Sequence, residues 1–236
     1  MALDRRAQTV LQTVVELYIT KAEAISSGFV CQELQEKFSS ATIRHVMADL
    51  EKEGLLYQPH TSAGRIPTEA GLRLYVHELL SPRLQPWDRS HLEDAVAHAV
   101  PHDFVEQLGH GLAALAGQMA VVAVGAEALS HTVLYMEGTR YLVKQPEFSQ
   151  IKKVRQLLHL IDDRAQMLGW LTRAGANEGV SVTLGKESPL PDLACVVSKR
   201  AQANRGCVTV GLLGPTRMNY NRLIPMVEFA AYLSER

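Results

Sequence analysis

A short segment that begins at Ser39 carries the side chains best suited to contact with a nucleic acid. Its first turn holds the hydroxyl donors Ser39, Ser40 and Thr42, and one turn later Arg44 and His45 follow. A helix N-terminus favours phosphate because its N–H groups and its dipole point at the anion. Arginine can also form the paired hydrogen bonds that identify guanine by its O6 and N7 atoms. We therefore expect the N-terminal half of this segment to meet DNA.

A second group of polar side chains follows in the loop between Leu55 and Thr68. Arg65 is the only residue with a full charge in this loop, and the preceding Gly64 lets the loop approach a backbone closely. Arg65 could lie along phosphates or enter a narrow minor groove. The remaining polar donors of the loop are His60, Thr61 and Ser62. The loop therefore predicts a second DNA contact.

Three short helices are expected to precede this loop and to hold the first segment in place. Each predicted helix starts at a side chain that can accept a hydrogen bond from the first turn, and Gly54 ends the third. The three capping residues are Asp4, Ser27 and Ser39. In the third helix the apolar spacing turns Ile43, Met47 and Leu50 inward and leaves the polar side outward.

The loop itself has the pattern of a hairpin, with short apolar edges around a turn-rich centre. Thr68 then starts another helix, which is predicted to end near Leu80. Three helices followed by a hairpin are typical of a winged helix-turn-helix. We therefore predict such a DNA-binding domain over residues 1–85.

The second half of the chain is predicted to be a small α+β domain over residues 118–236. Two prolines in Ser81–Ser90 indicate a domain boundary, and a linker helix is expected over 86–117. Strands are predicted at 119–126, 131–143 (a hairpin turning at Glu137–Gly138), 179–185, 193–199 and 206–214, and helices at 148–163 and 221–236. Short strands mixed with helices in this way favour a sheet covered by helices. Val208–Leu213 and Leu223–Leu233 are the most apolar parts and are expected to form its core.

Composition places the chain among globular proteins, with 236 residues, 47% hydrophobic residues and a net charge of −1. No apolar run reaches the roughly 18 residues needed to span a bilayer. The N-terminal MALDRRAQTV lacks the apolar core of a signal peptide. Three cysteines are a small and odd number, which favours a reducing compartment over a disulfide framework. We therefore expect a cytoplasmic protein without a membrane partner.

The patterns that would indicate an enzyme are incomplete. GVSVTLGKES superficially resembles a phosphate-binding loop, but its glycines have the wrong spacing and Glu187 stands where a Ser or Thr would hold magnesium. His98 and His102 have the spacing of two metal ligands on a helix, but Pro101 lies between them and no Glu or Cys partner is near. We predict no enzyme activity, no metal site and no cofactor.

Two other functions compete with DNA binding by a repressor. A winged helix can serve as a protein–protein module, because a fold does not fix a function. The second domain could bind a small molecule, with Arg217, Tyr220 and Tyr141 lining a pocket. In the opposing interpretation, Gly214 and Pro215 form a turn that Arg217 braces by hydrogen bonds. The brace is favoured, because no cluster of convergent polar groups is visible in the sequence.

The segment SSATIRHVMADLEKEGLLYQPHTSAGRIPTEAGLRLYV, which starts at Ser39, closely resembles the HrcA family of bacterial heat-inducible transcription repressors. QPEF at Gln145–Phe148 and GLLGPTRMNYNRLIPMVEF at Gly211–Phe229 are similar to two further signatures of that family. The resemblance covers residues 1–80 and 132–234. It implies an N-terminal winged helix-turn-helix followed by a GAF-like α+β domain that an inserted dimerisation segment interrupts.

The resemblance also implies a function. A protein of this family would be a homodimeric repressor of chaperone operons, bound to double-stranded DNA at an inverted-repeat operator called CIRCE and released on heat stress. The GroE chaperonin would maintain it in its active form.

The chain departs from the family pattern at three places. His45 replaces the common Asn and Val46 replaces an acid, which bears on the operator sequence that is read. Asn219 replaces the usual Asp, which is a mild change. The stretch between Val121 and Thr132 has no room for a long insert, which leaves the route of dimerisation open.

Overall fold

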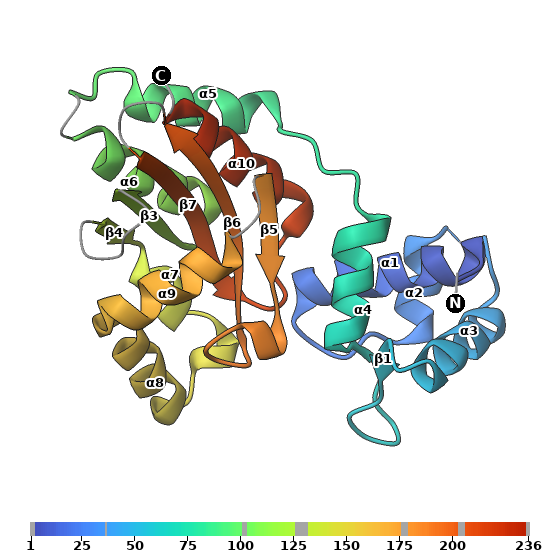
Figure 1. The fold of residues 1–236 in the computed structure, drawn as a ribbon. Coiled ribbons are helices and arrows are strands. Elements are labelled where there is room, and N and C mark those ends of the chain that lie inside the picture. The colour runs from blue at the N-terminus through green and yellow to red at the C-terminus, as the bar shows by residue number, and fades with distance from the viewer. Residues whose placement is uncertain are drawn as a thin grey trace. The chain divides into compact units, whose positions relative to one another are not determined.

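The computed structural model describes residues 3–35, 37–100, 103–125, 132–175, 179–202 and 206–234. The chain divides into two compact units, Met1–Ser81 and Pro82–Arg236 (Figure 1). No helix among the described residues combines the length and the apolar character needed to cross a membrane. Pro101 and His102, considered above as part of a metal motif, lie outside the described residues, as do residues 126–131 of the stretch considered for an insert.

The three predicted helices and the hairpin are all present in the N-terminal unit. Its elements are α1 (Arg5–Lys21), α2 (Ser27–Glu33), α3 (Ser40–Lys52), β1 (Leu56–Tyr57), β2 (Ile66–Pro67), α4 (Glu69–Leu74) and a π-helical continuation (Tyr75–Leu79). The predicted caps Asp4, Ser39 and Thr68 each accept a hydrogen bond from a backbone N–H of the first turn. The prediction that Ser27 caps the second helix is wrong by one residue. Ser26 is the cap, because Ser27 is already helical and its hydroxyl lies 3.2 Å from that of Ser40 on α3.

The core of the N-terminal unit is formed where α1, α3 and the end of α4 meet. Apolar residues recur at helical spacing on one side of α1 and of α3, and those that face the core are buried. They are Val10, Leu11, Val14 and Val15 on α1 and Ile43, Met47 and Leu50 on α3. Tyr75 closes this core, and its pKa lies well above the ordinary value, first because of burial and then because of the nearby Glu16 carboxylate. The predicted inward face of α3 is thus confirmed.

The C-terminal unit has the predicted α+β class. Its elements are α5 (Pro86–Val96), α6 (Phe104–Ala116), β3 (Met119–Gly125), β4 (Val133–Glu137), α7 (Thr139–Val143), a 3-10 turn (Pro146–Phe148), α8 (Ile151–Asp162), α9 (Arg164–Ala174), β5 (Gly179–Thr183), a second 3-10 turn (Gly185–Glu187), β6 (Leu193–Gln202), β7 (Gly206–Pro215) and α10 (Tyr220–Leu233). The five strands form one antiparallel sheet in the order β4-β3-β7-β6-β5. Strands predicted at the positions of β3, β5, β6 and β7, and helices at those of α8 and α10, are confirmed.

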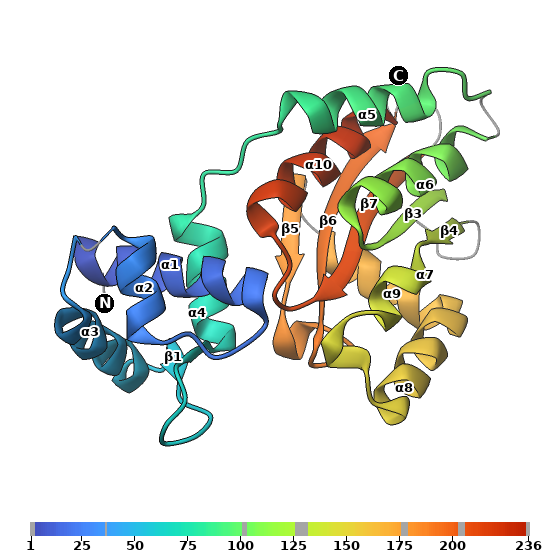
Figure 2. The ribbon, with the colours of Figure 1, turned by 180° about the vertical axis from the view of Figure 1, so that it is seen from behind.

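Helices cover both faces of this sheet (Figures 1 and 2). Alternation along β3 sends Met119, Val121 and Ala123 into a cluster with residues of α7, α8 and α9, among them the buried Trp170. On the other face, α6 packs on β3, α10 packs on β6 and β7, and α5 contacts both of these helices. The predicted core segments around β7 and α10 are buried, as expected.

Three details of the second half differ from the prediction. The single helix expected over 86–117 is two helices, of which α6 packs directly on β3 and β4. The hairpin expected to turn at Glu137–Gly138 is wrong, because β4 ends there and α7 begins. Gly138 makes this change of direction with a φ of 87°, and a Cβ on it would lie only 2.9 Å from the Gln118 carbonyl oxygen. Helix α9 follows α8 without having been predicted.

The turn after β7 is held by Arg217, which supports its interpretation as a brace. Its Nε donates to Glu147 at 2.6 Å, and Nη2 donates to Gln145 at 3.0 Å, so that the two family-like segments contact each other. Tyr220 is buried, and its hydroxyl donates to the Thr216 carbonyl at 2.6 Å. Tyr141 lies instead beside Arg140, with 4.8 Å between guanidinium and ring centre. Arg217 and Tyr220 are thus occupied in holding the turn, which does not support the alternative that these residues line a ligand pocket.

Candidate nucleic-acid interface

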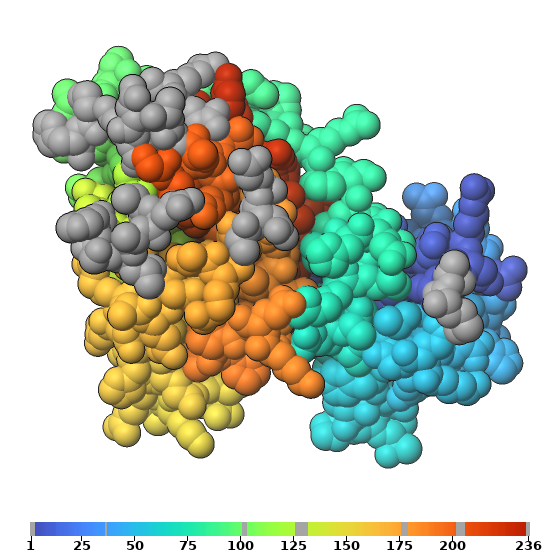
Figure 3. All heavy atoms as spheres, in the orientation of Figure 1, coloured from blue at the N-terminus to red at the C-terminus, as the bar shows by residue number. Residues whose placement is uncertain are grey.

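Helix α3 presents an exposed and mostly polar stripe opposite its buried face. Ala41, Arg44, His45, Asp49 and Lys52 are exposed and recur at helical spacing, whereas Ile43 and the other apolar residues lie in the core. Helix α3 is therefore buried on one side and exposed on the other, and the light-blue segment that contains it lies at the surface of the N-terminal unit in Figure 3.

The three hydroxyls at the start of α3 have distinct local roles. The Ser39 hydroxyl accepts a hydrogen bond from the Thr42 N–H at 3.1 Å and lies 2.9 Å from the Thr42 hydroxyl. The Ser40 hydroxyl lies 3.2 Å from that of Ser27, which joins the start of α3 to α2. Ser39 is exposed, whereas Ser40 and Thr42 are half-buried. These contacts fix the helix N-terminus, so that its first turn has a defined direction for an anion.

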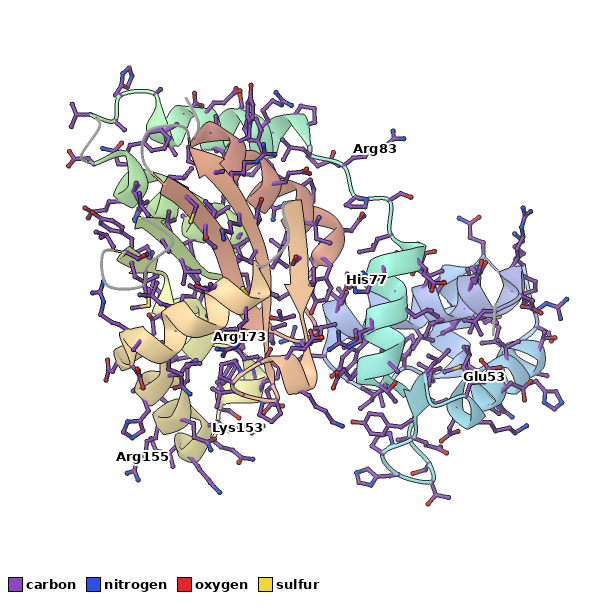
Figure 4. All side chains as sticks on the ribbon, in the orientation of Figure 1. Glu53, His77, Arg83, Lys153, Arg155 and Arg173 are labelled. Atoms are coloured by element: carbon purple, nitrogen blue, oxygen red, sulfur yellow. The ribbon has the colours of Figure 1, made fainter. Side chains whose placement is uncertain are left out.

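Two of the three acids near the end of α3 have cationic partners. Asp49 is 2.9 Å from the Lys52 ammonium, and this hydrogen bond holds the pKa of the carboxyl below its usual value. Glu51 pairs with Arg65 of the hairpin formed by β1, β2 and the loop between them (residues 56–67), which we call the wing. Glu53 stands at the C-terminal end of the helix, away from the N-terminal turn (Figure 4). The negative charges of Asp49 and Glu51, which would repel a phosphate, are therefore compensated by cations, and Glu53 lies at the opposite end of α3 from the N-terminal turn.

The tip of the wing is closed by the side chain of Gln58. Its amide donates to the carbonyls of Thr61, at 3.1 Å, and Ala63, at 2.8 Å. The Ala63 N–H donates in turn to the His60 carbonyl at 2.8 Å. The predicted contact residues His60, Thr61 and Ser62 are all exposed on this closed tip. The structure thus brings them together at one end of the hairpin.

Arg65 is held within the fold by Glu51 and by the backbone of Ile25. Its guanidinium Nε and Nη2 lie 3.0 and 2.9 Å from the Glu51 carboxylate, and its side chain is only 15% exposed. Its backbone exchanges two hydrogen bonds with Ile25, of 2.9 and 2.8 Å. An arginine held in this way joins the root of the wing to α3 and to the chain ahead of α2. The geometry therefore favours a structural brace over the expected phosphate or minor-groove contact.

Gly64 permits this contact with Ile25. A Cβ on Gly64 would overlap the backbone atoms of Ile25, and backbone cannot move aside as a flexible side chain can. The close approach that Gly64 allows in the structure is to the backbone of Ile25 in the same chain. The wing root is thus fixed from both sides.

Sequence reasoning missed two cations beside the start of α3. The Arg6 guanidinium lies 5.6 Å from the centre of the Phe38 ring, and the Lys37 ammonium lies 5.8 Å from it. Both side chains belong to exposed residues, and Phe38 directly precedes the cap of α3. Arg6 is distant in sequence, so that only the packing of α1 against α3 could reveal it. Lys37 could have been found as the cation nearest to the Ser39 cap.

The exposed side of α3, the wing tip and the two cations beside Phe38 offer hydrogen-bond donors and positive charge. Donors from the first turns of α3, the wing tip and the Arg6–Lys37 pair can contact phosphates, and Arg44 and His45 can reach base edges. Among the described residues, no group of three His, Cys, Asp or Glu side chains is placed to hold a metal ion.

Comparison with known proteins identifies the family. The model of the HrcA protein C terminal domain matches residues 72–224. The heat-inducible transcription repressor HrcA of Syntrophobacter fumaroxidans is 27% identical over 334 residues, covering 98% of this chain and 96% of that protein. That of Thermosynechococcus vestitus is 27% identical over 343 residues, covering 99% and 97%. Both alignments are longer than the 236 residues of this chain, so these relatives contain internal residues without a counterpart here.

A solved structure shares the fold. The crystal structure of a hypothetical protein, at 20% identity, superposes with a TM-score of 0.82 and covers 99% of this chain and 98% of that one. At this identity the likeness concerns the fold alone. The family model spans more than half of the chain and the two repressors are covered nearly end to end, so this chain belongs to the HrcA family.

Proposed function

We propose that the chain is a DNA-binding transcription repressor of heat-shock operons. The observation that carries this proposal is the exposed stripe of α3, with Arg44 and His45 outward and the opposite face locked in the core. A helix held in this way can enter a major groove, which admits an α-helix. The family relatives bear the name heat-inducible transcription repressor. Repression is binding, not catalysis, so no enzyme activity is part of the proposal.

Base reading falls to Arg44 and His45. Arg44 is suited to guanine, and His45 can donate to or accept from a base edge according to its tautomer. Because the family commonly has Asn at the position of His45, a changed base preference is expected there. Ser39, Ser40 and Thr42 would set the helix N-terminus against a phosphate.

Phosphate contacts from the rest of the unit would fix its register on the duplex. His60, Thr61 and Ser62 at the wing tip supply polar donors, and Arg6 and Lys37 supply charge next to the start of α3. Arg65 belongs to this proposal as the residue that holds the wing against Glu51. This assignment replaces a direct phosphate contact by Arg65.

The protein would act as a homodimer on an inverted-repeat operator of the CIRCE type. One recognition helix reads too few base pairs to single out an operator, and two-fold symmetry doubles the readout. Heat would unfold the C-terminal unit and separate the copies, and the GroE chaperonin would restore the folded form. We place this activity in the cytoplasm.

Footprinting of the purified protein on the DNA upstream of its own operon tests the proposal. Protection of two half-sites in inverted orientation, one helical turn or a multiple apart, is expected. Protection should disappear with scrambled half-sites. A protein that is folded by circular dichroism yet protects no sequence would contradict DNA binding and would favour a protein–protein role for the winged helix.

The heat response needs a separate measurement. Dimer content, operator binding and folding of the C-terminal unit should fall together as temperature rises. Added chaperonin should raise the temperature at which each of the three falls. Loss of operator binding while the dimer and its C-terminal fold persist would contradict this mechanism and leave operator recognition untouched.

A further inference from the structure

A large aromatic side chain is exposed on the outer side of the C-terminal unit. Trp87, at the start of α5, is 58% exposed, more than any other aromatic residue that the structure describes. Tryptophan is highly buried on average in folded proteins and is enriched at the centres of protein–protein interfaces. Helix α5 packs on α6 and α10, and its opposite side forms an outer layer of the unit (Figures 1 and 2). Trp87 is therefore not part of the core that these helices share.

His91, one turn further along α5, holds the Trp87 ring in place. The centres of the two rings are 3.8 Å apart and their planes are inclined by 37°. The His91 Nδ1 lies 2.9 Å from the Trp87 carbonyl oxygen, which can only accept a hydrogen bond, so Nδ1 is the donor. The indole ring is therefore a preordered projection, and little conformational entropy remains to be lost when it binds.

A hollow of about 560 Å³ lies two turns further along the same side of α5. Its lining residues come from the end of α5 and the first half of α6: Ala95, Asp103, Glu106, Gln107, His110 and Gly111. The two helices meet there through small residues, since a Cβ on Gly111 would lie only 2.6 Å from the Cβ of Ala95. Residues 87, 91 and 95 are spaced by four and lie on one side of the helix. The hollow thus borders the side that carries Trp87, about 12 Å along the helix from it at 1.5 Å per residue.

A projection at one end of a helix pair and a hollow at the other end are complementary to a second copy of the same chain. A two-fold axis between them sets the two α5 helices antiparallel and brings each projection to the other copy's hollow. A hollow of this size can hold an indole ring, and Glu106 and Gln107 carry oxygen atoms that can accept from the indole N–H.

We propose that two chains pair through the outer face of α5 and α6, with Trp87 of each copy in the hollow of the other. This inference rests on the proposed function, of which the homodimer is a part, and it names the surface that forms the dimer.

The exposed charges are divided along this face as such a pairing requires. Arg83 and Arg89 are exposed near the Trp87 end of α5, whereas Asp94 and Glu106 are exposed near the hollow. In an antiparallel pairing the basic end of one copy meets the acidic end of the other, which favours this partner and this orientation. The helices have 11 and 13 residues and are about 17 and 20 Å long. Their outer face is at the small end of specific interfaces, so a dimer that dissociates in the micromolar range is expected.

Sedimentation of the full-length protein over a range of concentrations tests the pairing. The wild-type protein should pass from monomer to dimer as its concentration rises. Trp87→Ala should raise the dissociation constant of the dimer at least about 30-fold, as the loss of a central aromatic anchor does. Gln107→Trp, which fills the hollow and keeps Trp87, should weaken the dimer to a similar extent. Ile151→Ala is the matched control and should change nothing, because Ile151 is 68% exposed on α8, outside this face.

Tryptophan fluorescence reports on the surface itself. The chain has two tryptophans, and Trp170 is only 2% exposed. Quenching by acrylamide should therefore come mainly from Trp87, and it should decrease as rising concentration forms the dimer. In Trp87→Ala the remaining emission should not depend on concentration.

Four results would overturn the pairing. The wild-type chain could stay monomeric at every concentration, or Trp87 could be quenched equally in monomer and dimer. Trp87→Ala and Gln107→Trp, both folded by circular dichroism, could form a dimer as tight as the wild type. A dimer lost only in Ile151→Ala would place the interface on α8. If Trp87→Ala does not fold, Gln107→Trp and the quenching of the wild-type protein decide.

Footprinting with the same variants separates this surface from the proposed function. A dimer that forms through Trp87 and protects no operator would reject DNA binding and retain the surface. Protection of two half-sites by a wild-type protein whose dimer persists in Trp87→Ala would retain the proposed function and reject the surface.

Discussion

The outer side of α3 and the wing use their arginines in opposite ways. Arg44 is exposed on a helix whose other face is buried, whereas Arg65 is held by Glu51 and by the backbone of Ile25. Both residues stand at positions where a winged helix can contact DNA. The difference shows that a residue's position in a motif does not determine its role, because a side chain at a contact position can instead be bound by a partner within the same fold.

Replacement of Arg44 should have the largest effect on DNA binding. Arg44→Ala is expected to cost ~1–3 kcal/mol of operator binding and to relax base preference in each half-site, because a paired contact to one base is lost. Competition titration with operator and scrambled DNA measures this difference. Lys52→Ala, two turns further along the same exposed stripe, is the control and should change specificity little. Equal affinity of Arg44→Ala and wild type for both DNAs would refute the recognition-helix assignment.

Replacement of Arg65 should act on stability instead. Arg65→Ala is expected to lower the free energy of unfolding of the N-terminal unit by about 1 kcal/mol, since a partly buried charged hydrogen bond is lost. Because the two side chains bond each other, the effects of Arg65→Ala and Glu51→Ala should not add in the double variant. Denaturant unfolding of the three variants measures the coupling. Additive effects, together with a salt dependence of DNA binding reduced by about one ion, would return Arg65 to the phosphate contacts.

Arg6 and Lys37, the two cations beside Phe38, are expected to contact phosphates and not bases. Lys37→Ala should weaken operator and scrambled DNA alike and reduce the slope of log affinity against log salt by about one. Lys152→Ala on α8 should leave the slope unchanged. Loss confined to the operator would mean that Lys37 contributes to sequence choice.

The smallest expected effect is a pH dependence at the Asp49–Lys52 pair. The pKa of Asp49 is lowered in the fold by Lys52, so its contribution to stability is present above the unfolded pKa of about 3.9 and is lost as pH falls through the lower folded value. The pKa of Lys52 is raised by Asp49, so that contribution is lost only as pH rises above the ordinary lysine range. Asp49→Asn should therefore differ slightly from wild type at neutral pH and match it in strong acid. A difference that persists unchanged in acid would assign the effect to something other than the carboxylate charge.

The sequence predicted those parts of the fold that depend on neighbours in the chain. Caps such as Asp4 and Ser39, and the buried face of α3, follow from spacings of three and four residues. The Glu51–Arg65 pair and the position of Arg6 beside Phe38 depend on packing between distant segments, and no local pattern encodes them. The end of β4 at Gly138 is a similar case. The local sequence has the pattern of a hairpin, but the residues after Gly138 form helix α7, which packs on β3 and β7. The sequence predicts that Arg44 and His45 lie outward on α3 and that His60, Thr61 and Ser62 lie in the loop of the wing. It does not predict that Arg65 pairs with Glu51.

The fixed root and closed tip of the wing have a consequence for the thermodynamics of binding. Each residue that must be ordered on association costs roughly 1–2 kcal/mol of conformational entropy. With Arg65 tied to Ile25 and Gln58 spanning the tip, most of this ordering is already complete in the free protein. Operator association should therefore lack the large negative heat-capacity change of coupled folding and binding. In the terms of calorimetry, the wing is expected to bind as a preformed part whose affinity depends on fit rather than on folding.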